Sequence, residues 1–214
     1  MSVVVDFAFN PFQENTYVIY DETNECVIID PGCYTSEEKK TLDDFIVKNQ
    51  LKPVRLINTH CHLDHIFGNK HVAEKYGLKL EIHKGELPVL EAAPQVAKMY
   101  GIPMPDESPA AEVFLEEGQQ LEFGQTKLDI LFTPGHSPAS ISFYNKVDKY
   151  LIGGDVLFLG SIGRTDLPGG NFETLIRTIK TQILTLPAET KVYSGHGGPT
   201  TVGFEAMNNP FLQD

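Results

Sequence analysis

One short stretch of the sequence, residues 59–65 (Thr-His-Cys-His-Leu-Asp-His), brings together side chains that could bind metal ions. Its imidazoles and its carboxylate are ligand types that suit zinc, iron or manganese. Residues two apart in an extended chain point the same way, so His60 and His62 can hold one ion. If the chain then turns toward a helix at Ile66, Asp64 and His65 can face a second position. Two ions about 3.5–4 Å apart are the usual arrangement for metal-assisted hydrolysis.

Three later residues fit as further ligands or supports for such a site. His136, Asp155 and His196 each follow a predicted apolar strand, and each has glycine beside it. The chain has 7 histidines, and five of them occupy these positions or the 59–65 stretch. The other two, His71 and His83, are interpreted as ordinary structural histidines. Cys61 points away from its neighbours in an extended chain, so it is expected to be a packed, inert thiol.

The elements that must position these residues alternate between strands and helices. Apolar runs predict a hairpin and a helix before residue 50, a strand that leads into the 59–65 stretch, and a second series of strands after residue 120. Helices are expected after Ser36, which is the candidate N-cap, over 71–76 and over 172–184, and an interrupted one over 86–99. Prolines at 103, 105 and 109 predict an irregular segment. We therefore expect one α/β domain over residues 1–214, with two packed sheets and helices outside.

Composition limits the classes of function. The 214 residues include 17 Lys plus Arg and 29 Asp plus Glu, a net charge of −12, which disfavours general nucleic-acid binding. The sequence has no run of about 18 apolar residues, so no membrane helix is predicted. The start of the chain lacks the basic head of a signal peptide. Three cysteines cannot all pair within one chain, which favours reduced thiols and a cytoplasmic location. The oligomeric state is left open.

The chain resembles the metallo-β-lactamase superfamily in several motifs, and the segments 15–17 (Asn-Thr-Tyr) and 30–32 (Asp-Pro-Gly) also fit. The motifs are His60-Cys61-His62-Leu63-Asp64-His65, Pro134-Gly135-His136-Ser137, Gly154-Asp155 and Gly195-His196-Gly197. It is most similar to the short form of the glyoxalase II (hydroxyacylglutathione hydrolase) branch, without that branch's C-terminal helical domain. The resemblance implies a four-layer αββα sandwich.

By the same resemblance, seven residues hold two divalent ions, zinc first, with iron or manganese as alternatives. His60, His62 and His136 would hold the first ion. Asp64, His65 and His196 would hold the second, and Asp155 would bridge both. The implied activity is hydrolysis of a small S-acylglutathione-type thioester through a metal-bridging hydroxide, with Asp64 and Asp155 as catalytic residues. Neither a nucleic acid nor a membrane is expected as a partner.

The sequence leaves open which reaction the protein catalyses and on which substrate. The stretch 163–166 (Gly-Arg-Thr-Asp) also resembles persulfide dioxygenases of the superfamily, which use one iron. Another ester, a lactone or a β-lactam could be the substrate, whereas a mere metal-binding module would not need a water-activating pair. Arg164 could bind an anionic substrate group bidentately, or it could form a structural ion pair with Asp166 or Glu173.

Overall fold

The computed structural model describes residues 1–104 and 106–213, so Pro105 of the predicted irregular segment lies outside the described residues. Its contacts divide the chain into two compact units. The first unit comprises Met1–Leu115 and Glu122–Thr126, and the second comprises Glu116–Leu121 and Lys127–Asp214. The single domain predicted over 1–214 stays a prediction.

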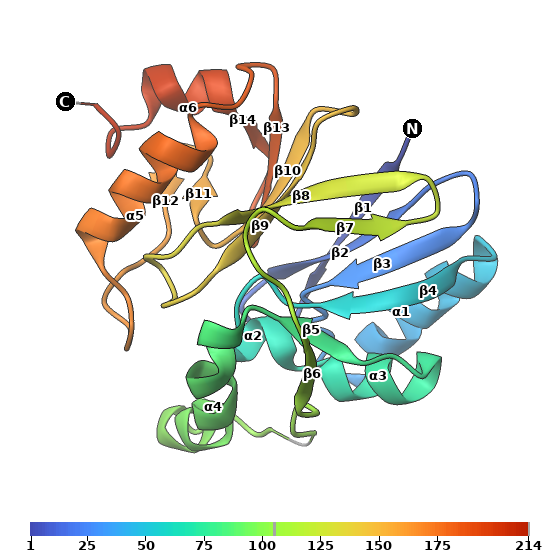
Figure 1. Cartoon of the computed structure of the whole chain (residues 1–214). Coiled ribbons are helices and arrows are strands. Elements are labelled where there is room, and N and C mark those ends of the chain that lie inside the picture. Colours follow the sequence, from blue (N-terminus) through green and yellow to red (C-terminus); the bar gives the residue numbers. More distant parts are fainter. Residues whose placement is uncertain (105, 214) are drawn as a thin grey trace. The chain divides into compact units, whose positions relative to one another are not determined.

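The first unit is built on a six-stranded sheet in the order β1-β2-β3-β4-β5-β6 (Figure 1). The first three strands form an antiparallel meander, and β3 to β6 run parallel to one another. Parallel neighbours need crossover connections, and helices supply them here. The strands are β1 (Val3–Phe9), β2 (Glu14–Tyr20), β3 (Glu25–Ile29), β4 (Lys52–Ile57), β5 (Leu80–Ile82) and β6 (Ala111–Phe114).

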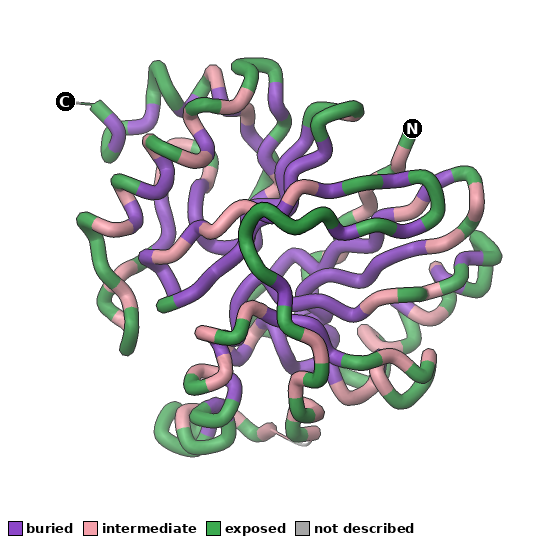
Figure 2. The backbone as a smooth tube through the Cα atoms, in the orientation of Figure 1, coloured by how far each residue is buried: buried purple, intermediate pink, exposed green. Residues whose placement is uncertain are grey.

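The helices of the first unit bury one face of this sheet. They are α1 (Ser36–Lys48), α2 (Leu63–Ile66), α3 (Asn69–Tyr76), the 3₁₀ turn η1 (Lys84–Glu86) and α4 (Leu87–Tyr100). Leu42 and Ile46 of α1 and Val72 of α3 join strand residues such as Ile28 and Leu56 in one buried apolar cluster. Figure 2 shows β2 and β3 buried along nearly their whole length.

Two sequence predictions for these helices need correction. The N-cap of α1 is Thr35 rather than Ser36, because Thr35 and Glu38 form a reciprocal capping box. Helix α4 is continuous where an interruption was predicted. Pro88 lies in the first helical turn, where its missing N–H has no intrahelical partner to lose, and Pro94 is exposed within the helix. Strand β6 was missed in the proline-rich segment.

The second unit is built on a sheet in the order β14-β13-β10-β9-β8-β7. The turn at Gly124, between residues 120–123 and 126–132, belongs to the first unit. The strands are β7 (Gln120–Phe123), β8 (Thr126–Phe132), β9 (Ile141–Asn145), β10 (Tyr150–Gly154), β13 (Lys191–Ser194) and β14 (Thr200–Thr201), with a separate pair β11 (Leu157–Phe158) and β12 (Ser161–Ile162).

Helical segments of the second unit pack on this sheet through a second apolar cluster. They are α5 (Phe172–Thr178), the π-helical turn η2 (Ile179–Ile183) and α6 (Val202–Asn208). The predicted 172–184 helix is therefore present, but its last turn widens. Leu175 and Ile179 pack with Leu151 of β10 and Val192 of β13. Two sheets with helices confirm the predicted α/β class. Among the described residues, no helix has the length and apolar character needed to cross a membrane.

Candidate metal centre

The histidine stretch of the first unit leaves strand β4 and enters helix α2. His62 is extended (φ −67°, ψ 155°) and is the N-cap of α2, so the chain becomes helical at Leu63, earlier than the predicted turn at Ile66. The ring centroid of His60 lies 4.8 Å from that of His62 and 4.1 Å from that of His65. The fold thus places the imidazoles of His62 and His65 next to that of His60, with His60 and His65 fully buried.

Asp30 orients the imidazole of His65 directly and that of His60 through Thr59. Its Oδ1 accepts a hydrogen bond from the Thr59 N–H (2.7 Å), and its Oδ2 accepts one from the Thr59 hydroxyl (2.6 Å). The same Oδ2 lies 3.1 Å from Nδ1 of His65. The Thr59 hydroxyl proton goes to Asp30, so the His60 Nδ1–H donates to Thr59 Oγ1 (3.0 Å). In both histidines Nε2 is then the nitrogen that can bind an ion.

Sequence reasoning gave Asp30 no role at the site. Ligand atoms of Asp30, His60 and His65 all lie within 4.8 Å of one another. Asp30 is 1% exposed and has φ 49°, a left-handed conformation that non-glycine residues seldom adopt. The available signal was its place directly after an apolar strand and before Pro31-Gly32.

Glu14, at the start of β2, is a second missed carboxyl. It is fully buried, and its Oε2 accepts a hydrogen bond from the Thr16 hydroxyl (3.0 Å). Its Oε1 lies 3.9 Å from Nδ1 of His65. Burial raises the pKa of Glu14 well above its usual value, although His65 pulls in the opposite direction.

Buried polar side chains hold the backbone of the histidine stretch. The Asn58 amide donates to the His65 carbonyl (2.8 Å), and the Asn69 amide donates to Asn58 Oδ1 (2.7 Å). Glu86 accepts a hydrogen bond from the Cys61 N–H (3.0 Å). Cys61 itself is 1% exposed, which confirms the prediction of a packed cysteine. Burial raises the pKa of its thiol, and its inertness stays a prediction.

The second unit gathers its predicted ligands at the ends of three strands. His136 follows β8, Asp155 follows β10 and His196 follows β13, as the sequence predicted. Asp155 Oδ2 lies 3.5 Å from Nε2 of His136 and 3.5 Å from Nε2 of His196. The His136 Nδ1–H donates to the Arg164 carbonyl (2.7 Å), which again directs Nε2 toward the carboxylate.

Gly135, next to His136, is needed for packing. Its φ is 133°, and a Cβ there would lie 2.4 Å from the Cα of Leu175. Helix α5 therefore contacts the backbone of the His136 turn directly. With a larger residue at position 135, either the His136 turn or helix α5 would have to shift.

The donor atoms fit a metal ion in both chemistry and spacing. Two ligands at about 2.1 Å from one ion, in tetrahedral directions, are about 3.4 Å apart. The two Asp155 distances in the second unit match this separation. In the first unit, His65 Nε2 lies 3.7 Å from Asp64 Oδ2, close to the same value. The seven predicted residues thus form a donor group in each unit, and their division between two ions stays a prediction.

The guanidinium of Arg164 pairs bidentately with Asp166, with both N···O distances 2.7 Å. This confirms one of the two interpretations of the sequence. Hydrogen bonds from Arg164 lower the pKa of Asp166 to about 2. Both side chains are exposed, at 61% and 69%. A role of Arg164 in substrate binding stays a prediction.

Two histidines predicted to be structural have structural roles. His71 lies 3.1 Å from Asp43 through Nε2, and His83 Nδ1 accepts a hydrogen bond from the Gly85 N–H at the start of η1.

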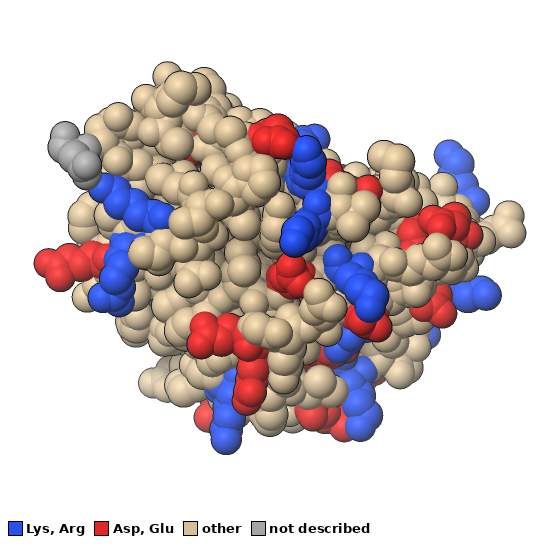
Figure 3. Space-filling model, turned by 45° about the horizontal axis from the view of Figure 1, so that its top comes forward, with Lys and Arg blue, Asp and Glu red and all other residues tan. Residues whose placement is uncertain are grey.

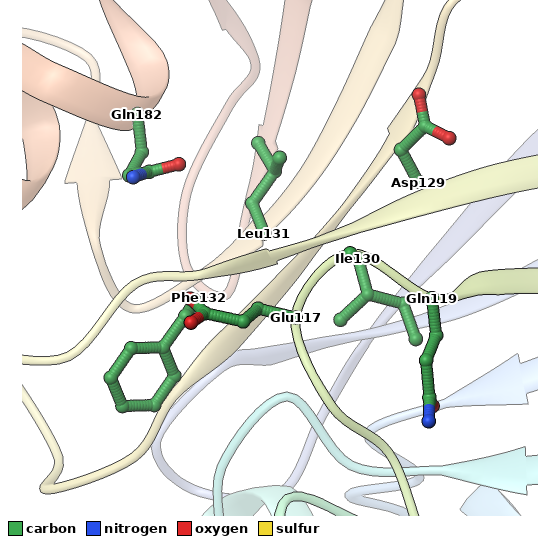
Figure 4. A pocket seen from close by; sticks show the side chains of 8 residues that line it. Glu117, Gln119, Asp129, Ile130, Leu131, Phe132 and Gln182 are labelled. Atoms are coloured by element: carbon green, nitrogen blue, oxygen red, sulfur yellow. The ribbon is translucent and has the colours of Figure 1, made fainter.

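A pocket of about 450 Å³ in the second unit is lined by Leu131 and Phe132 of β8 and by Gln182 of η2. In Figure 4, Leu131 and Phe132 point to opposite sides of β8, and Gln182 lies on the side of Leu131. A pocket of about 460 Å³ in the first unit lies between α4 and β6, with Leu90 and Met104 in its wall. Predicted metal ligands are not among the lining residues of either pocket.

Comparison with known proteins identifies the family. The sequence model of the metallo-beta-lactamase superfamily matches residues 9–196. A Bacillus subtilis (strain 168) protein described as "Probable metallo-hydrolase YqgX" is 40% identical over 204 residues, which cover 94% of this chain and 93% of that protein. "Hydroxyacylglutathione hydrolase GloC" of Haemophilus influenzae (strain Rd) is 36% identical over 202 residues, with coverages of 94% and 93%.

A solved structure, TTHA1623 in a di-iron-bound form, matches with a TM-score of 0.87 and 37% identity, covering 98% of this chain and 100% of that one. The chain therefore belongs to the metallo-β-lactamase superfamily. Within it, the two relatives place the chain among the metallo-hydrolases, and the superfamily implies a bound divalent metal.

Proposed function

We propose that the protein hydrolyses small S-acylglutathione-type thioesters with two divalent metal ions. The observation that carries this proposal is the position of Asp155. One oxygen of its carboxylate lies 3.5 Å from Nε2 of both His136 and His196, so it would contribute to the site beside a proposed ligand of each ion. A relative described as a hydroxyacylglutathione hydrolase adds the substrate class.

The proposed ligand assignment draws on both units. The first ion is assigned to His60, His62 and His136, the second to Asp64, His65 and His196, and Asp155 serves both. When bound, the ions supply a water of lowered pKa and polarise the thioester carbonyl. Zinc is proposed first, and the same imidazole and carboxylate donors also accommodate iron or manganese.

The chain's own residues then provide orientation and proton handling. Asp64 is in the first turn of α2, adjacent in sequence to the buried His65 and only partly buried itself. Its carboxylate can accept a proton from the attacking water and hold that water toward the carbonyl carbon. Asp155 holds the imidazoles of His136 and His196 in position relative to each other. No serine or cysteine nucleophile is required, and the buried thiol of Cys61 is unsuited to be one.

Substrate recognition is assigned to Arg164. Its side chain is exposed, and its guanidinium already holds the Asp166 carboxylate in the bidentate geometry that a substrate carboxylate would adopt. A glutathione conjugate carries such carboxylates. We therefore propose that the substrate replaces Asp166 as the partner of Arg164.

A second candidate is a persulfide dioxygenase with one iron. The observation in its favour is the Gly163–Asp166 stretch, which resembles that group and forms the Arg164–Asp166 pair. The two candidates differ in metal stoichiometry and in oxygen use.

The proposed setting is a cytoplasmic enzyme with a small-molecule substrate and no nucleic-acid or membrane partner. All three cysteines are buried, and none forms a disulfide, which suits a reducing compartment. On the face shown in Figure 3, Lys and Arg side chains are interspersed with Asp and Glu side chains. A continuous basic surface would be expected of a nucleic-acid binder.

The experiment that tests the proposal compares reactions on one protein preparation. The zinc-loaded chain is expected to hydrolyse S-lactoylglutathione and to consume no oxygen with glutathione persulfide. Oxygen uptake by a form with one iron per chain, without thioester hydrolysis, would favour the dioxygenase.

A further inference from the structure

The buried carboxyl of Glu14 is unused by the proposed mechanism, although it lies behind a proposed metal ligand. Glu14 is 0% exposed, and its Oε1 is 3.9 Å from Nδ1 of His65. Asp30 already lies at 3.1 Å from that nitrogen. Within the described residues, Glu14 Oε1 has no hydrogen-bond partner. A buried carboxyl oxygen without a hydrogen bond is costly, so its retention points to a purpose other than stability.

Glu14 is held in place by its neighbours on β2 and after β3. The Thr16 hydroxyl donates to Glu14 Oε2 (3.0 Å) and accepts a hydrogen bond from the Gly32 N–H (2.8 Å). A Cβ on Gly32 would lie 1.9 Å from Glu14 Oε2 and 2.5 Å from the Asp64 carbonyl oxygen. Glycine at position 32 therefore lets the Glu14 side chain reach the metal-binding stretch.

Asn10 extends the same assembly to a second proposed ligand. Its side-chain amide donates to the carbonyl oxygens of Gly32 and Asp64, each at 3.0 Å. We call Asn10, Glu14, Thr16 and Gly32 the N-terminal clamp. Its contacts reach Asp64 through the backbone and His65 through Nδ1.

We propose that Glu14 is a positioning residue that sets the affinity of the second metal position. The inference rests on the proposed function, since Asp64 and His65 are assigned to the second ion there. Glu14 acts through His65, as a second carboxyl behind the imidazole that keeps Nε2 aimed at the ion. The clamp belongs to the first unit throughout, and it bears on two ligands of the same ion.

The test is Zn²⁺ uptake by metal-free protein in competition with a chromophoric chelator, for wild type and Glu14→Gln. Glutamine keeps the shape and an acceptor for Thr16, but removes the carboxyl behind His65. We expect the first equivalent to bind as in wild type and the second to bind about 10–100-fold more weakly. The metal-free variant is expected to melt at the wild-type temperature or higher, because a neutral amide replaces a buried carboxyl.

Glu205→Gln is the matched control. Glu205 is also a fully buried carboxyl, and it accepts hydrogen bonds from the Gly160 N–H, the Thr200 hydroxyl and the Asn209 amide. Its substitution should lower the melting temperature and leave both metal affinities unchanged. If Glu14→Gln does not fold, Thr16→Val is used, which keeps Glu14 but releases Oε2. This variant should also bind the second equivalent of Zn²⁺ more weakly than wild type.

The outcomes separate this inference from the proposed function. If wild type, Glu14→Gln and Thr16→Val bind the second equivalent of Zn²⁺ with equal affinity, the proposed role of Glu14 is overturned. The two-metal proposal itself would stand. Equal weakening of both equivalents in Glu14→Gln would show a general structural role and also overturn it. A wild-type chain that takes up a single equivalent would overturn the two-metal proposal itself, and the inference with it.

Discussion

The Nδ1–H of His136 donates a hydrogen bond of 2.7 Å to the backbone carbonyl oxygen of Arg164. A carbonyl oxygen only accepts, so the contact fixes the imidazole tautomer and leaves Nε2 facing Asp155. Because the backbone makes this contact, the Arg164 side chain can be replaced without releasing His136. The positioning of the ligand and the binding of substrate can therefore be tested separately at one residue.

Arg164→Ala should retain the wild-type metal content and lose about tenfold in kcat/KM on thioesters that carry a carboxylate, because a charge-assisted hydrogen bond is lost. On a neutral thioester the loss should be small. Steady-state kinetics on both substrates and elemental analysis of the same preparation check this. Asp166→Ala is the control, and it should lower KM because it frees the guanidinium. Unchanged kinetics in Arg164→Ala would remove Arg164 from substrate binding.

Three ligand variants test the proposed metal site. His62→Ala, Asp155→Ala and His196→Ala should each lose at least about 100-fold in hydrolase activity, since each removes a donor from a charge-stabilising centre. Circular dichroism should show a near-normal fold, because each residue lies at a strand or helix end rather than in an apolar cluster. Full turnover by His196→Ala would count against a second catalytic ion.

The cysteines should be unreactive in the folded protein. Cys26, Cys33 and Cys61 are all buried, and burial raises the pKa values of Cys26 and Cys33 to about 12 and that of Cys61 well above its usual value. The thiolate is the reactive form, so iodoacetamide at pH 8 should label none of them until denaturant is added. Rapid labelling of the native chain, read by mass spectrometry, would contradict the burial of these thiols.

Asp21 should make stability depend on acid pH. Burial opposes its ionisation, but hydrogen bonds from Thr23, the Gln125 N–H and Thr126 outweigh burial and lower its pKa to about 2. A lowered pKa in the folded state stabilises the fold above the unfolded value of about 3.9, and this contribution is lost as pH falls toward 2.

Asp21→Asn should therefore reduce the free energy of unfolding at pH 7 by about 1–2 kcal/mol and flatten its decline between pH 4 and pH 2. Urea unfolding at several pH values measures both effects. Glu22→Gln is the control at an exposed neighbour and should behave as wild type. If the free energy of unfolding of Asp21→Asn falls between pH 4 and pH 2 as steeply as that of wild type, this carboxylate does not cause the acid dependence.

The sequence predicts those parts of the site that depend on local spacing. The spacing of His60, His62, Asp64 and His65 directly after a strand predicts a change from extended chain to helix within this stretch. The helix begins at Leu63 rather than at the predicted Ile66. Most strands and helices are also local patterns of apolar residues, and the prediction places them correctly. Helix α4 was missed as one element because Pro88 and Pro94 suggest breaks, whereas one lies in the first turn and the other is exposed.

The supporting contacts could not be predicted, because they join distant segments. Asp30 is 29 residues from Thr59, and the Arg164 carbonyl is 28 residues from His136. Glu14 is an ordinary strand residue in the sequence, and only the fold buries it beside His65. Such contacts depend on strand order, which a single sequence does not reveal.

We propose that the protein is a two-metal thioester hydrolase, and metal content measured together with turnover on S-lactoylglutathione tests this most directly. The chain, purified without added metal and then equilibrated with Zn²⁺, should hold two equivalents per chain. Hydrolysis should disappear when the second equivalent is removed by a chelator. A chain that holds one iron, leaves the thioester intact and consumes oxygen with glutathione persulfide would contradict the account.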